Sequence, residues 1–236
     1  MSSSSLTDPL GAARVVVHML EKAAEFGLTI TCSSDFDDFI DLRRERRGGE
    51  VSPMFDPAIT QLDNSRAFWM KAVLDQTQVV SLQAFRLDIV HTNLAEWALG
   101  WMAGLYIKRQ ELVMPSSIEP PEHSRSRLLK GGLVYHGEAW IDNKALKKRE
   151  WFDHFLKLGM LISLIKWQPD AVWALTSKAF VTHGLVARAG YGLQERGFFK
   201  WHDEWQPAGA ESTEWLMVAE RTHLEFLVAE EASKLP

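Results

Sequence analysis

The stretch that decides the fold runs from Leu133 to Thr176 and reads LVYHGEAWI (133–141), DNKALKKRE (142–150), WFDHFLKLGMLISLIKW (151–167) and, after Gln-Pro-Asp, AVWALT (171–176). Its first segment is rich in β-branched and aromatic residues, which predicts a strand. Its third segment has the apolar spacing of an amphipathic to buried helix, and Pro169 stops that helix. The last segment is again a short strand. This strand, helix and strand are typical of an α/β domain.

Upstream of this stretch, helical and strand-like segments alternate. Asp8 ahead of Pro9 is the order expected of a helix cap and a first-turn proline. Asn93 with Glu96 three residues later forms a capping-box pair. The elements expected here are a helix over 9–26, a strand over 28–32, a helix capped by Ser34, a second helix over 62–74, a strand over 79–87 and a helix from Asn93, although 98–107 also reads as a strand.

Residues 112–130 carry three prolines, several serines and a basic end. This composition is typical of an exposed, flexible connection, and we expect it to act as a lid that orders around a ligand. Downstream of residue 176, the sequence predicts a helix over 180–189, a glycine-rich exit at 190–192, and closing strands over 213–219 and 224–228.

Composition narrows the class of protein. With 236 residues, of which 46% are hydrophobic, the chain is expected to form one domain over 1–236 with a sizeable core. The net charge of -5 and the absence of a continuous basic face argue against nucleic acid as a partner. No apolar run reaches the roughly 18 residues of a membrane span, and Met1 to Leu10 lacks the features of a secretion signal, so we expect a cytoplasmic location without membrane contact.

The order of these elements is similar to that of the acyl-CoA N-acyltransferase (GNAT) superfamily. The more specific likeness lies where a strand ends in Thr176-Ser177 and the next helix runs out through Arg188-Ala-Gly190-Tyr191. The resemblance implies a mixed, mostly antiparallel central sheet with helices on both faces. It also implies acyl-CoA, carrying an acetyl or longer acyl group, as co-substrate, and a small-molecule or peptide amine as acceptor.

One motif departs from the family. After the strand that corresponds to Leu133–Ile141, the family has a loop of the form Q/R-x-x-G-x-G/A whose amides hold the pyrophosphate, whereas residues 142–150 contain no glycine. Cations ahead of a helix can bind phosphate by charge instead, or they can form a solvated surface turn. The proposed cofactor contacts are Lys144, Lys147, Lys148 and Arg149, with Thr176 and Ser177 bonding a pantetheine-like amide or capping the following helix.

The resemblance implies a general base on the same strand. Glu138 is the first candidate, because partial burial would raise its pKa toward a useful value, and His136 would share the role or orient Glu138. Alternation predicts that Tyr135 points to the other face of the strand. It also allows Glu138 and His136 to be an ordinary polar pair on one side. Tyr191 is the phenol nearest to the position of the family's general acid.

Metal and nucleophilic chemistry are not indicated. The histidines lie at no standard ligand spacing, and the lone Cys32 has no basic neighbour in sequence. Trp201 and Trp205 flank a polar stretch and indicate a ligand rim or a subunit contact, as in a homodimer. Two functions therefore stay open: an N-acyltransferase, or a non-catalytic interaction or small-ligand-binding domain that has lost CoA binding.

Overall fold

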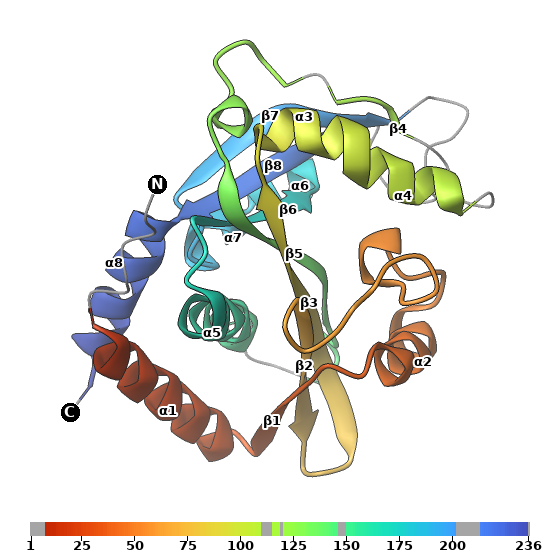
Figure 1. Ribbon diagram of the computed structural model, residues 1–236. Helices are drawn as coiled ribbons and strands as arrows, with labels where there is room; N and C mark the ends of the chain where they lie inside the picture. Colours follow the sequence, from red (N-terminus) through yellow and green to blue (C-terminus); the bar gives the residue numbers. More distant parts are fainter. Residues whose placement is uncertain (1–7, 110–114, 119, 146–149, 202–212, 236) are drawn as a thin grey trace.

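The structure is a computed structural model that describes residues 8–109, 115–118, 120–145, 150–201 and 213–235. A single sheet runs through it with the strand order β1-β2-β3-β5-β6-β8-β7-β4 (Figure 1). The strands are β1 (Leu28–Ser33), β2 (Ala67–Leu74), β3 (Gln78–Val90), β4 (Pro115–Ser117), β5 (Gly131–Ile141), β6 (Ala171–Thr176), β7 (Leu193–Trp201) and β8 (Thr213–Glu220). Within these residues, β5 and β6 are the one pair of strands in parallel, and the other pairs are antiparallel. The predicted fold class is confirmed.

Helices cover both faces of the sheet. The helices are α1 (Pro9–Glu25), α2 (Phe36–Arg47), α3 (Leu94–Trp97), α4 (Ala103–Lys108), α5 (Glu150–Trp167), α6 (Lys178–Thr182), α7 (Leu185–Arg188) and α8 (Arg221–Ala232). A π-helical turn over Ala98–Met102 joins α3 to α4, and 3-10 turns lie at Pro53–Phe55 and Arg125–Arg127. The chain over 94–108 is therefore helical, and its alternative interpretation as a strand is wrong.

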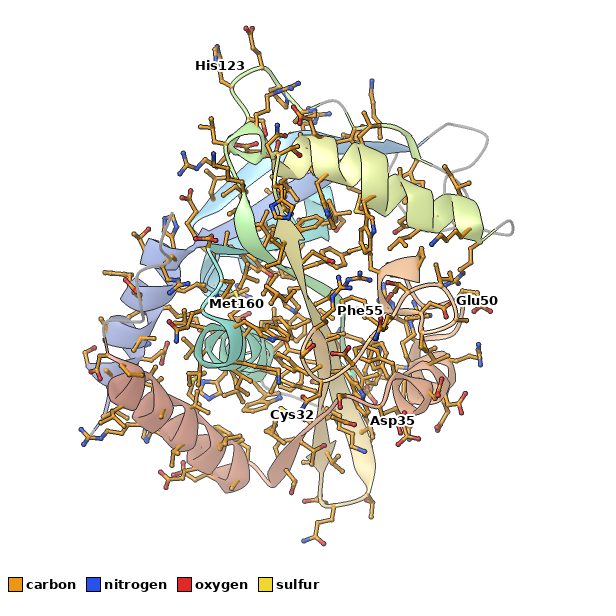
Figure 2. The ribbon with its side chains drawn as sticks, in the orientation of Figure 1. Cys32, Asp35, Glu50, Phe55, His123 and Met160 are labelled. Atoms are coloured by element: carbon orange, nitrogen blue, oxygen red, sulfur yellow. The ribbon has the colours of Figure 1, made fainter. Side chains whose placement is uncertain are left out.

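Two apolar cores lie on opposite sides of the sheet. The first packs α1, α5 and α8 against one face, and the second packs α2, α3 and α4 against the other. Figure 2 shows Met160 on the α5 side and Phe55 on the α2 side. We call these faces the α5 face and the α2 face. Because both faces are covered, the central strands are buried on both sides, which agrees with the long buried run of β3 and the short apolar run of β6.

Several sequence-based expectations were wrong. Residues 67–74 form strand β2 and not the second half of a helix, so one helix and not two follows β1. Residues 221–232 form helix α8 where a closing strand was expected. Strand β7 was not predicted at all. Asp35 and not Ser34 caps α2, since its Oδ1 accepts hydrogen bonds from the amides of Asp37 and Asp38.

Part of the expected lid lies within the described residues. Ser124 and Ser126 are buried, and the Arg125 guanidinium forms a two-point ion pair with Glu220 at 2.6 Å. Glu195 of β7 accepts hydrogen bonds from the Ser124 hydroxyl and from the Arg125 amide. These contacts fasten the second half of the connection to β7 and β8. Whether the connection moves stays a prediction.

Candidate functional site

The candidate site lies where β5 and β6 separate. The two strands pair in register at Leu133 with Ala171, Val134 with Val172 and Tyr135 with Trp173, and none of the described residues beyond these pairs across. Further along, β5 pairs with β3 and β6 pairs with β8. The facing edges of β5 and β6 therefore carry backbone amides and carbonyls outside any strand ladder. An extended ligand with its own amides can pair with such edges.

A β-bulge distorts β5 at this point. Ala84 of β3 pairs with Gly137 and Leu82 pairs with Trp140, so β5 holds one extra residue across from Gln83. Glu138 sits in the bulge with φ of 55°. A left-handed conformation costs a residue with a side chain about 1–3 kcal/mol, and such residues cluster at functional sites.

The bulge turns Glu138 onto the α2 face. Its Oε2 accepts hydrogen bonds from Arg43 Nε at 2.9 Å and Arg47 Nη1 at 3.3 Å, and its Oε1 accepts one from the Ser52 amide at 2.7 Å. The side chains of Glu138 and Arg43 are 6% and 8% exposed, so this ion pair is buried. The Glu138 carboxylate therefore has three donors within hydrogen-bond distance.

His136 lies on the α5 face. Its ring stacks on Phe85 with centroids 4.3 Å apart, and its Nδ1 lies 2.6 Å from the Tyr191 hydroxyl. The interpretation of Glu138 and His136 as a polar pair on one side is therefore wrong, because Glu138 lies inside the bulge, where its left-handed backbone turns the side chain to the other face. Tyr135 points to the α2 face, opposite His136, as predicted.

Burial keeps the His136–Tyr191 pair neutral. Burial lowers the pKa of His136 to about 3 and raises the pKa of Tyr191 far above its ordinary value. At neutral pH the imidazole is therefore uncharged and the phenol keeps its proton. The hydrogen bond between the two groups is therefore one between neutral partners, and which of them donates depends on the tautomer of His136.

Among the described residues, three of the buried polar atoms without a hydrogen-bond partner belong to side chains of the neighbouring strands β3 and β5. They are His136 Nε2, Gln83 Oε1 and Ser81 Oγ. The Gln83 amide nitrogen donates to the Phe155 carbonyl of α5 at 2.6 Å, so the side chain is held while its oxygen is free. Buried polar groups are rarely unsatisfied, and such atoms often indicate a bound water or ligand.

The basic loop is only partly described. Lys144 is exposed, and its amide closes a turn on Asp142 Oδ1 at 2.9 Å. Lys147, Lys148 and Arg149 lie outside the described residues. α5 begins at Glu150, so these cations immediately precede the positive end of an 18-residue helix dipole.

The remaining sequence candidates have structural roles. Ser177 caps α6, since its Oγ accepts from the Phe180 amide at 3.4 Å, and Thr176 pairs with Trp215 of β8. Trp201 is buried and donates its indole N–H to Glu214 at 2.7 Å, whereas Trp205 lies outside the described residues. Among the described residues no group of His, Cys, Asp or Glu could hold a metal ion.

One further cluster, on the α2 face, was not predicted from the sequence. Tyr106 of α4 packs against Phe199 and Trp201, and burial followed by the charge of Glu214 raises its pKa. The nearby charge of Glu138 adds to this shift. The charges of two carboxylates thus act on an aromatic cluster that lies across the sheet from His136. Only the apolar spacing of 94–105 could have indicated that Tyr106 faces inward.

None of the described helices is both long enough and apolar enough to cross a membrane. No protein-family model matches the chain, and no curated protein matches it.

Solved structures with a similar chain path exist. One is a spermidine N-acetyltransferase from Vibrio cholerae, with 9% identity, coverage of 84% of this chain and 96% of that chain, and a TM-score of 0.47. Another is a GNAT-family acetyltransferase from Streptococcus agalactiae, with 12% identity, coverage of 82% and 95%, and a TM-score of 0.42. A third is an N-acyl amino acid synthase from uncultured soil microbes, with 9% identity, coverage of 89% and 85%, and a TM-score of 0.38. At these values, the reaction of this chain has to be argued from its own residues.

Proposed function

We propose that the protein is an N-acyltransferase that moves an acyl group from acyl-CoA to a small-molecule or peptide amine in the cytoplasm. The observation that carries this proposal is the separation of β5 and β6 after three residue pairs, with the strained Glu138 at the point of separation. The reaction needs a slot for an extended thioester arm, an acid for the leaving thiolate and a base for the amine. The chain offers candidate residues for the slot, the acid and the base.

The described residues fit an acyl-CoA substrate. The pantetheine arm is extended and carries two amides, which match the unpaired backbone edges of β5 and β6. The buried polar atoms of His136 and Gln83 that lack partners supply further hydrogen-bonding capacity next to this slot. Lys144, Lys147, Lys148 and Arg149 precede α5 and would hold the phosphates by charge in place of a glycine loop.

Tyr191 is our candidate for the acid. As the amine nitrogen attacks the thioester carbonyl, the C–N bond forms, the C–S bond breaks and the thiolate accepts a proton. A buried phenol with a raised pKa keeps its proton until negative charge develops on the leaving sulfur. His136, 2.6 Å away, would orient the hydroxyl, and the tyrosinate would regain its proton from solvent after CoA leaves.

Glu138 is our candidate for the base on the other side of the sheet. It would take the proton that the amine loses, and Arg47 is the donor most easily released because its side chain is 45% exposed, compared with 8% for Arg43. Thus the amine would approach from the α2 face and the thioester from the α5 face. The strand opening would join the two.

Calorimetry tests the binding step. Acetyl-CoA and a longer acyl-CoA are titrated into the wild-type protein and into a variant in which Lys147, Lys148 and Arg149 are alanine. A control variant replaces Lys22, Lys108 and Lys234, which lie outside the loop. We expect saturable binding that weakens at least about tenfold in the loop variant only. No heat with either ligand would favour the interaction or small-ligand-binding domain.

Kinetics test the chemical step. With CoA release as the readout and a panel of amines, Tyr191→Phe should lower kcat by about 100-fold with little change in acyl-CoA affinity. Glu138→Gln should lower kcat most at low pH, where the amine is protonated. An unchanged kcat in both variants would remove these residues from the mechanism.

A further inference from the structure

The outer side of α1 carries a second apolar stripe. Helix α1 uses Ala12, Val15, Met19 and Ala23 to pack against the core. Leu10, Ala13, Val17, Leu20 and Ala24 recur at helical spacing on the opposite side and are exposed, with Leu10 at 72% and Val17 at 54%. Figure 1 shows α1 at the periphery of the molecule, with α5 and α8 on its inner side. A helix that is apolar on two sides has one side without a partner.

A shallow groove runs along this stripe. It has a volume of about 460 Å³, and its lining includes Leu10, Val17 and Leu235 together with the charged Arg14 and Glu21. Arg14 and Glu21 are exposed and lie on the same flank of the stripe. No ion pair of Arg14 occurs among the described residues, and Glu21 has only a 4.0 Å contact with His18. The positions of these two opposite charges indicate which partner fits the groove.

The spacing of the charges fits a second copy of this helix. Arg14 and Glu21 lie at equal distances on either side of the midpoint between Val17 and His18. A two-fold axis at that midpoint, perpendicular to α1, makes the helices antiparallel and keeps the charged flanks on the same side. Arg14 of each copy then faces Glu21 of the other, so the two pairs form by symmetry.

The apolar residues also complement each other in this arrangement. Leu10 of one copy lies within one residue of the level of Ala24 of the other, and Leu20 lies within two residues of the level of Ala13, so a large side chain lies near a small one at each end. The two Val17 side chains meet near the axis. Alternation of large and small residues allows two helices to pack closely.

We propose that the protein forms a homodimer through antiparallel pairing of the outer faces of α1, held by the apolar stripe and two Arg14–Glu21 ion pairs. The surface lies on α1 and does not include the strand opening. This proposal is therefore independent of the proposed acyl transfer.

Sedimentation velocity of the full chain over a range of concentrations tests the proposal. Wild type should approach the mass of two chains, and Val17→Glu should give one chain at all concentrations with an unchanged circular dichroism spectrum. Arg14→Glu and Glu21→Arg should each weaken the dimer at least about tenfold, because each replaces two attractions by two repulsions. The double reversal should restore wild-type affinity to within about threefold.

The control variant is Glu45→Arg on α2, which changes the charge by the same amount as Glu21→Arg but on the other face of the sheet. It should leave the dimer intact. A wild-type chain that stays monomeric would overturn the proposal. A dimer that survives Val17→Glu, or a double reversal that fails to recover affinity, would also overturn it.

Discussion

The buried imidazole of His136 links the stability of the protein to pH. Burial lowers its pKa to about 3 in the folded protein, whereas the unfolded chain has the ordinary value of 6.5. The folded state therefore binds fewer protons between these two values. Stability is fully present above the unfolded pKa and is lost progressively as the pH falls from about 6.5 toward about 3.

A His136→Gln variant should have a flatter dependence of stability on pH. Between about pH 7 and about pH 5, wild type should lose about 2 kcal/mol more free energy of unfolding than the variant. Urea unfolding followed by tryptophan fluorescence at several pH values gives these slopes, which do not depend on any constant loss caused by the substitution. His183→Gln, at an exposed position, should keep the wild-type slope. Parallel curves for wild type and His136→Gln would contradict the prediction.

Gly159 lets α5 approach the sheet closely. A Cβ at this position would lie 2.5 Å from the Phe85 ring and 2.6 Å from Gln83 Nε2. Gly159→Ala should therefore lower the free energy of unfolding by about 1–3 kcal/mol, despite the better helix propensity of alanine. Gly104→Ala in α4 is the matched control, since no atom lies within 4 Å of its added Cβ. Its stability should stay the same or rise by up to about 1 kcal/mol. Equal effects in thermal unfolding would refute the packing argument.

At the scale of elements, the start of α2 depends on one carboxylate. Asp35 Oδ1 accepts from the Asp37 amide at 3.1 Å and the Asp38 amide at 3.2 Å, whereas Ser34 makes no such contact. Asp35→Ala should cost about 1 kcal/mol of stability, and Ser34→Ala should cost close to nothing. Chemical denaturation of the two variants measures the difference. The opposite ranking would restore Ser34 as the cap.

The sequence predicted elements well where one pattern dominated. Strands β1, β3, β5 and β6 and helices α1 and α5 carry a clear apolar run or a clear helical period. β2 was misread because Ala67–Met70 is buried on both faces, which removes the alternation of a strand, and its residues include good helix formers. α8 was misread because LEFLV at 224–228 is a short, mostly apolar run, which periodicity alone does not distinguish from a strand. In β7, the register shift between Arg196 and Phe199 interrupts the alternation.

At the scale of the whole molecule, the candidate site could be predicted only in part. Glu138, His136 and Tyr191 could be chosen from the sequence, but their arrangement could not. His136 and Tyr191 are 55 residues apart and meet only because α7 returns the chain to the α5 face. The extra residue in β5 moves Glu138 to Arg43, a contact over 95 residues that no local pattern encodes. Bulges and long-range pairs depend on the assembled sheet.

Two hydrogen bonds hold the second half of the connection over 112–130 to strand β7. Glu195 of β7 accepts hydrogen bonds from the Ser124 hydroxyl and from the Arg125 amide. Removing a charged acceptor from a partly buried site costs about 1.5–3 kcal/mol. Here the loss lowers the free energy that is needed to open the connection locally. Glu195→Ala should therefore speed native-state cleavage by trypsin after Arg125 and Arg127 at least about tenfold. Mass spectrometry of the fragments identifies the cut.

Glu122→Ala is the control for that experiment, because Glu122 is exposed in the same connection and should leave the cleavage rate unchanged. Adding acetyl-CoA separates anchoring from lid closure. If the connection closes over a bound ligand, a saturating concentration should slow cleavage of the wild-type protein and should slow the Glu195→Ala variant less, because its anchor to β7 is gone. Cleavage that responds to Glu195→Ala but not to acetyl-CoA would mean that the connection is a fixed strap, and the prediction of a lid would be wrong.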